Sequence, residues 1–180
     1  MYFPDLSPYT LTKKNYGELN VGWLGEGHPF PQGNSPPAFV ERLKQFCAFH
    51  VHLVRCICPC FLCEPWGFVA QDTSEREKIF KEVHRVEVNG ELIHLGSAEI
   101  RVLGKERKIY AAPDLIYHYV AAHKYLPPQE FIDAVMTCPP DWCRYACIYP
   151  KNTGGILERL FSWGDPKPPV GELMWPEDNY

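Results

Sequence analysis

Two pairs of metal-binding side chains constrain this chain more than any other feature. Cys60 and Cys63 form a C-x2-C pair in a cysteine-rich segment, and His118 and His123 form an H-x4-H pair on a predicted helix. Two thiolates and two imidazoles complete the tetrahedral shell of one Zn²⁺. Four protein ligands leave no coordination position for a substrate, so the pattern predicts a structural zinc site.

The spacing of the two histidines requires a distorted helix. Five positions on a regular helix turn through about 500°, which leaves His118 and His123 roughly 140° apart around the axis. They can bind one ion only if the last turn tightens or unwinds, and Pro127 and Pro128 fit a helix that ends here. The alternative is that both are ordinary surface or half-buried histidines.

The order of the predicted elements resembles that of a ββα zinc finger. The thiol turn comes first, a β-hairpin follows, and a helix carries the histidines. However, 54 residues separate Cys63 from His118, whereas a short finger has about 12. Either the intervening part is an insertion or the site belongs to a different zinc fold.

The chain has eight cysteines, and those outside the C-x2-C pair allow other interpretations. Cys56 or Cys58 could replace one of the two thiols as a ligand, and the cluster around them could instead be acylated or redox-active. Others could form a second metal site or disulfides, or serve as small buried apolar residues. The cysteines left open in this way are Cys56, Cys58, Cys138, Cys143 and Cys147.

Hydrophobic periodicity predicts a small α+β domain with short antiparallel hairpins. Asn89-Gly90 suits a type I′ turn between strands at 86–93. The other predicted elements are a strand near 19–23, helices at 36–50 and 72–83, a hairpin at 98–112, helices at 114–127 and 128–136, and a short helix at 156–161. We expect one zinc-stabilised domain at 1–136 and a Pro- and aromatic-rich extension at 137–180.

Charge and sorting signals narrow the possible functions. The net charge of −4 and the pI near 6.0 disfavour nucleic-acid binding. A basic hairpin that carries Arg101, Lys105, Arg107 and Lys108 keeps nucleic acid open as an alternative partner. No apolar run is long enough to cross a bilayer, and the first residues lack the features of a signal peptide, so we expect a cytoplasmic protein.

The sequence contains none of the common catalytic motifs considered. The sequence contains no G-x-S-x-G, no Walker loop and no H-E-x-x-H. The leading hypothesis is therefore a non-catalytic zinc-stabilised module that binds a protein partner, with an immunity- or antitoxin-like role as one specific case. The alternatives are a zinc-finger-like nucleic-acid binder and, third, a zinc-scaffolded hydrolase or nuclease that would use His84 or His94 with Glu99.

Several sequence blocks resemble an uncharacterised bacterial protein family. They include the segment 2–10, Leu19-Asn-Val-Gly-Trp-Leu24, the Cys60/Cys63 turn, and 110–120 followed by His123. The resemblance covers residues 1 to about 136, with 67–94 longer than in the family. It implies a fold and a zinc site, and the family carries no assigned function.

Overall fold

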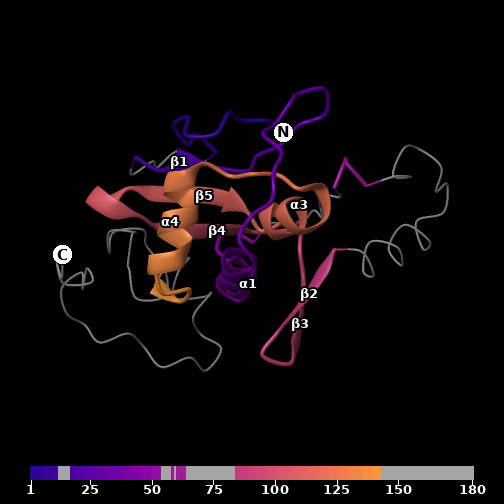
Figure 1. Cartoon of the computed structure of the whole chain (residues 1–180), viewed down its shortest axis with the longest axis vertical. Helices are drawn as coiled ribbons and strands as arrows, with labels where there is room; N and C mark the ends of the chain where they lie inside the picture. Colours follow the sequence, from indigo (N-terminus) through magenta and orange to yellow (C-terminus); the bar gives the residue numbers. More distant parts are fainter. Residues whose placement is uncertain (12–16, 54–57, 59, 64–83, 143–180) are drawn as a thin grey trace, which may run out of the picture. The chain divides into compact units, whose positions relative to one another are not determined.

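The computed structural model describes residues 1–11, 17–53, 58, 60–63 and 84–142 (Figure 1). The chain divides into a unit Met1–Pro140 and a unit Asp141–Tyr180, and the fold below is that of the first unit. The helices predicted at 72–83 and 156–161 lie outside the described residues, as do Cys56, Cys143 and Cys147. The division into a domain 1–136 and an extension 137–180 remains a prediction.

A three-stranded sheet forms the centre of this unit (Figure 1). Its order is β1 (Leu19–Asn20), β5 (Ile109–Pro113), β4 (Glu99–Leu103). The hairpin β4–β5 is antiparallel, with Arg101 opposite Ala111, as the sequence predicts. The short β1 joins β5 in parallel and makes the sheet mixed, which the sequence did not indicate.

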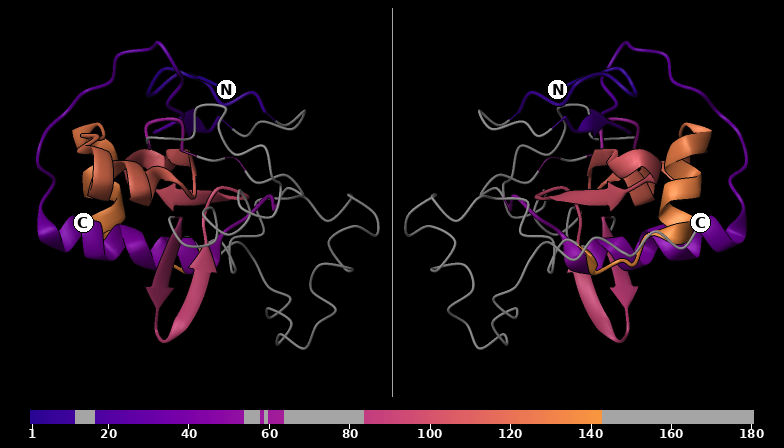
Figure 2. Two further views of the ribbon diagram at one scale, coloured as in Figure 1. Left: turned by 90° about the vertical axis from the view of Figure 1, so that its right-hand side faces the viewer. Right: turned by 90° about the vertical axis from the view of Figure 1, so that its left-hand side faces the viewer.

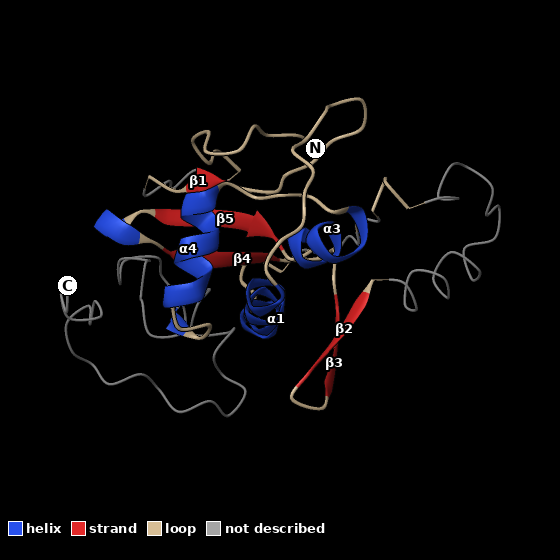
Figure 3. Ribbon diagram, in the orientation of Figure 1, coloured by secondary structure: helices blue, strands red, loops and turns tan. Residues whose placement is uncertain are grey.

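The strands β2 (Arg85–Val88) and β3 (Glu91–His94) form a separate antiparallel hairpin. Asn89 and Gly90 at its tip have φ angles of 52° and 83°. A type I′ turn needs positive φ at both positions, so this prediction is confirmed. Figures 1 and 3 show the hairpin projecting away from the three-stranded sheet.

The described residues of this unit also form three α-helices, and together with the sheets they confirm the α+β class. They are α1 (Pro37–Phe46), followed by a 3₁₀ turn at Cys47–Phe49, α3 (Ile116–His123) and α4 (Gln129–Thr137). Figure 2 shows α3 and α4 on the same side of the sheet. Phe131 joins the layers, because its ring meets Phe39 of α1 at 6.4 Å and Tyr110 of β5 at 5.8 Å, both edge to face.

The beginning of α1 differs from what its local sequence suggests. Ser35 before two prolines is typical of a side-chain cap. In the structure Pro36 is the capping residue and no side chain caps the helix. The Ser35 hydroxyl is buried and has no hydrogen bond within the described residues. Pro37 at the first helical position marks this helix start, because its fixed φ suits it and it has no N–H to satisfy.

The N-terminal segment packs aromatic rings on the sheet. Tyr9 is fully buried, and the Trp23 indole N–H donates to the Ala111 carbonyl at 3.0 Å. The Tyr125 hydroxyl donates to the Asp5 carboxylate at 2.8 Å, and the Gly22 N–H donates to the same carboxylate at 2.9 Å. These bonds hold the segment against the end of α3.

A buried ion pair lies under this segment and corrects the prediction of a basic hairpin surface. Arg101 is 3% exposed, and its guanidinium contacts the Glu99 carboxylate at 2.7 Å. The Tyr9 hydroxyl donates to the same carboxylate at 2.8 Å, and the Arg101 guanidinium stands over the Tyr9 ring at 4.7 Å. Arg101 is therefore part of the interior and cannot contact a nucleic-acid backbone. Glu99 is buried as well.

One glycine of the N-terminal segment is required for its conformation. Gly22 has φ +72°, and a Cβ there would lie 2.8 Å from Ile116 Cδ1. We expect Gly22→Ala to destabilise the domain by about 2–4 kcal/mol, because backbone strain and overpacking both contribute. Gly90→Ala is the matched control, since φ is +83° and no atom lies within 4 Å of the added Cβ.

Chemical unfolding monitored by tryptophan fluorescence measures both variants. The control should lose about 1 kcal/mol, which is the cost of strain alone. Equal losses in the two variants would show that the contact with Ile116 carries no energetic penalty.

Within the described part of the chain, the helices are too short or too polar to traverse a lipid bilayer.

Candidate metal centre

The two thiols come from a tight turn at residues 60–63. The Cys63 N–H donates to the Cys60 carbonyl at 3.3 Å, which closes the turn. The backbone N–H groups of Leu62 and Cys63 point at the Cys60 thiol and stabilise its ionised form. N–H donors around a cysteine sulfur suit a thiolate ligand, because they disperse its negative charge.

The two imidazoles come from α3, whose last turn is wide. Lys124 caps the helix in the left-handed conformation with φ 55°, and its N–H donates to the Tyr119 carbonyl. The Tyr125 N–H donates to the same carbonyl at 3.1 Å. The bond from Lys124 spans five residues and is π-type, so this turn holds more residues than a regular one. The structure therefore has the distorted helix end that the H-x4-H spacing requires.

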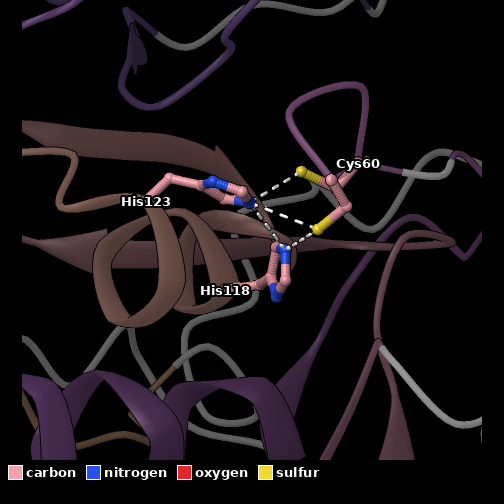
Figure 4. Close-up of side chains that lie close together, drawn as sticks. Cys60, His118 and His123 are labelled. Atoms are coloured by element: carbon pink, nitrogen blue, oxygen red, sulfur yellow. Dashed lines mark hydrogen bonds between the residues drawn. The ribbon is translucent and has the colours of Figure 1, made fainter. Parts of the chain in front are cut away.

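The turn and the helix end bring all four predicted residues together (Figure 4). Cys63 Sγ lies 3.1 Å from His118 Nε2 and 3.3 Å from His123 Nε2. Cys60 Sγ lies 3.3 Å from His123 Nε2, and the two Nε2 atoms are 3.2 Å apart. The four ligand atoms lie within 4.8 Å of one another, so this group could hold a metal ion.

These separations fit the edges of a zinc tetrahedron. Bonds of about 2.3 Å to sulfur and about 2.0–2.1 Å to nitrogen place tetrahedral ligands about 3.5 Å apart for S···N and about 3.3 Å apart for N···N. The sulfur–nitrogen separations of 3.1 to 3.3 Å and the nitrogen–nitrogen separation of 3.2 Å are shorter by only a few tenths of an ångström. The cluster is thus close to the required size.

The charge states also favour a cation. Burial lowers the pKa of His118 to about 4 and lowers the pKa of His123, so both imidazoles are neutral and have a lone pair for a metal at neutral pH. Burial raises the pKa of Cys60 to about 12. A buried thiol of this kind becomes a thiolate only when a positive charge such as Zn²⁺ arrives.

A third imidazole that the sequence did not assign to the site packs on this cluster. His84 is fully buried, and its ring meets the His118 ring edge to face at 4.7 Å. The next residue in sequence, Arg85, is charged and begins β2, so it gave no sign of this contact. His94, the other histidine considered for catalysis, is exposed at the end of β3.

The remaining described cysteines lie outside the cluster. Cys138 is buried, and its sulfur accepts the Leu103 N–H at 3.4 Å. Cys58 is exposed, and its N–H donates to the Gly96 carbonyl at 2.7 Å. All described cysteines are free thiols. Among the described residues, Cys60, Cys63, His118 and His123 form the one group of side chains that could hold a metal ion. The likeness to a ββα finger remains a prediction. The hairpin that leads into α3 is β4–β5, which belongs to the three-stranded sheet.

Comparison with known sequences identifies the family. The profile of the family described as "Domain of unknown function (DUF7919)" matches residues 1–136. This chain belongs to that family. No curated protein and no solved structure matches it. The family match spans both halves of the Cys2His2 cluster of this DUF7919 chain, the thiol turn and α3.

We expect the DUF7919 domain to lose stability as the pH falls. Burial lowers the pKa values of His84 and His118 to about 4, whereas both titrate near pH 6.5 in the unfolded chain. Between these values the unfolded state binds more protons, so stability decreases with decreasing pH. Thermal unfolding between about pH 7 and about pH 4.5 measures the effect.

His84→Phe should weaken the pH dependence, because it removes one of these two groups. His94→Asn on the exposed end of β3 is the control and should leave it unchanged. A thermal midpoint equal at both ends of the pH range would contradict this account.

Proposed function

We propose that this domain is a non-catalytic binding module held together by one structural Zn²⁺ on Cys60, Cys63, His118 and His123. The observation that carries the proposal is the convergence of four ligand atoms, from a thiol turn and a helix end, within 4.8 Å. Zinc is favoured because two sulfur and two imidazole ligands suit it better than harder cations.

Four protein ligands also argue against catalysis at this ion. A catalytic zinc keeps one position for water or substrate, with three protein ligands. Here the fourth position is taken by a side chain, and two of the ligands, Cys60 and His118, are buried. The hydrolase hypothesis would need one of these four residues to give way to water.

A protein partner is favoured over nucleic acid. Arg101 is buried, and Lys108 lies 3.9 Å from the Glu106 carboxylate and 3.6 Å from that of Glu130, so the expected basic surface is partly neutralised. The β2–β3 hairpin pairs with no further strand within the described residues, and its Leu92 is 53% exposed. An open sheet edge beside an apolar side chain suits contact with a protein.

The free thiols and the size of the chain bear on its compartment and on a more specific role. We place the protein in the cytoplasm, because reduced thiols persist there. The described cysteines are free, which agrees with such a compartment. An immunity- or antitoxin-like role is a hypothesis based on size and charge alone.

Metal stoichiometry by native mass spectrometry tests the site. One zinc per chain is expected in the wild type, and its loss is expected in Cys63→Ser and in His118→Ala. The matched controls are Cys138→Ser and His94→Asn, which change the same residue types outside the cluster and should retain the ion. Zinc absent from the wild type, or retained by both ligand variants, would refute the assignment.

Two further measurements separate the function classes. X-ray absorption at the zinc edge should show two sulfur and two nitrogen ligands, and an oxygen in the shell would revive the hydrolase hypothesis. Binding to random-sequence DNA and RNA at low salt should be absent. Salt-sensitive binding would instead favour the nucleic-acid alternative.

A further inference from the structure

The loop between β3 and β4 is hydrogen-bonded to two segments next to the metal centre. The Leu95 N–H donates to the carbonyl of His84, whose ring packs on His118. The Gly96 carbonyl accepts the Cys58 N–H at 2.7 Å, two residues before Cys60. The loop is therefore hydrogen-bonded to the segment that carries the thiols and to the residue that supports one imidazole.

A single buried carboxylate organises this loop. The Gly96 N–H donates to Asp114 Oδ1 at 2.7 Å, and the backbone N–H groups of Ser97 and Ala98 also bond to the Asp114 carboxylate. In return the Asp114 N–H donates to the Ala98 carbonyl at 3.0 Å. Asp114 is 2% exposed and stands two residues before the first residue of α3, the helix with both histidines.

We propose that Asp114 is a positioning residue for the metal centre, which fixes the thiol segment relative to α3 through the loop Leu95–Ala98. The chain of contacts runs from the Asp114 carboxylate to the Gly96 backbone, and from there to Cys58 and the thiol turn. The inference rests on the proposed zinc site. It names the carboxylate that would fix the position of the thiol turn relative to the histidines of α3. Buried partners of this kind, one step behind the ligands, usually matter for metal affinity.

The chemistry of the carboxylate explains why an aspartate is needed. Two oxygens with four lone pairs can accept three N–H donors, whereas an asparagine side chain offers one oxygen and turns its NH₂ group toward a donor. Burial raises the pKa of Asp114 to about 6, and the three N–H groups act in the opposite direction, so the group is ionised at neutral pH. Asp114→Asn would keep the shape of the side chain while leaving at least one buried N–H unsatisfied.

Cobalt titration of the metal-free full-length chain tests the inference. Thiolate-to-cobalt charge-transfer bands report how well the thiols reach the ion, which a general loss of stability does not alter. We expect Asp114→Asn to bind Co²⁺ about 10–100-fold more weakly than the wild type. Asp114→Glu keeps the charge and both oxygens, should lose less, and serves as the second variant if the first does not fold.

Val135→Ala is the matched control, because it removes buried packing from α4, a helix that contributes no residue to the metal cluster. It should lower thermal stability and leave the Co²⁺ affinity unchanged. Wild-type affinity in the Asp114 variants, or an equal loss in Val135→Ala, would overturn the positioning role. A wild type without the cobalt bands would instead refute the proposed zinc site itself.

Discussion

The domain stripped of its metal should unfold about 10 °C below the zinc-loaded domain. A ligand present at about 1,000 times its Kd stabilises the folded state by about 4 kcal/mol. For a domain of this size, each kcal/mol shifts the thermal midpoint by about 2–4 °C. A bound ion would link Cys63 to His118, which are separated by 54 residues. Loss of the ion would open this loop and increase the conformational entropy of the chain.

Thermal unfolding with and without a chelator, followed by re-addition of zinc, measures this effect. The Cys63→Ser variant is the control and should unfold at one temperature in all three conditions. A wild-type midpoint unaffected by complete removal of the metal would show that the ion contributes nothing to the fold.

Glu99→Ala should destabilise the domain by about 3–5 kcal/mol, the usual cost of leaving one member of a buried ion pair alone. Arg101 is 3% exposed, and Glu99 is its partner at 2.7 Å. The change also removes the acceptor of the buried Tyr9 hydroxyl. Since domains of this kind are stable by only about 5–15 kcal/mol, the variant should lose a large part of its total stability.

The double variant Glu99→Leu/Arg101→Met is the informative control. Replacement of a whole buried pair by apolar residues is often neutral or stabilising, so the double variant should recover most of the loss. Urea unfolding at fixed pH gives the three free energies. A single variant that loses less than about 1 kcal/mol would mean that solvent reaches the guanidinium.

Local signals in the sequence were sufficient for much of this fold. Asn89-Gly90 between two alternating runs predicts the β2–β3 hairpin, because few other residues tolerate positive φ at both turn positions. The four candidate ligands could also be chosen in advance, since a C-x2-C pair together with an H-x4-H pair is typical of zinc sites. The structure then brings these four side chains together.

Features that depend on packing between distant segments of the chain could not be predicted from the sequence. Glu99 and Arg101 alternate with apolar residues along β4, which is typical of a strand with one solvated face. In the structure that face is covered by Tyr9 from the N-terminal segment, so both charges are buried. His84 was missed for the same reason, because its partner His118 comes from a helix far along the chain.

The parallel pairing of β1 with β5 joins two segments that the ribosome synthesises far apart in time. Leu19 and Asn20 leave the ribosome early, but their partners Tyr110 and Ala111 are made only when most of the domain has been translated. Contacts between such distant segments form late and slowly. The aromatic N-terminal segment must therefore remain exposed in the nascent chain until β5 emerges, and this is the period in which the protein is most exposed to aggregation or to capture by chaperones.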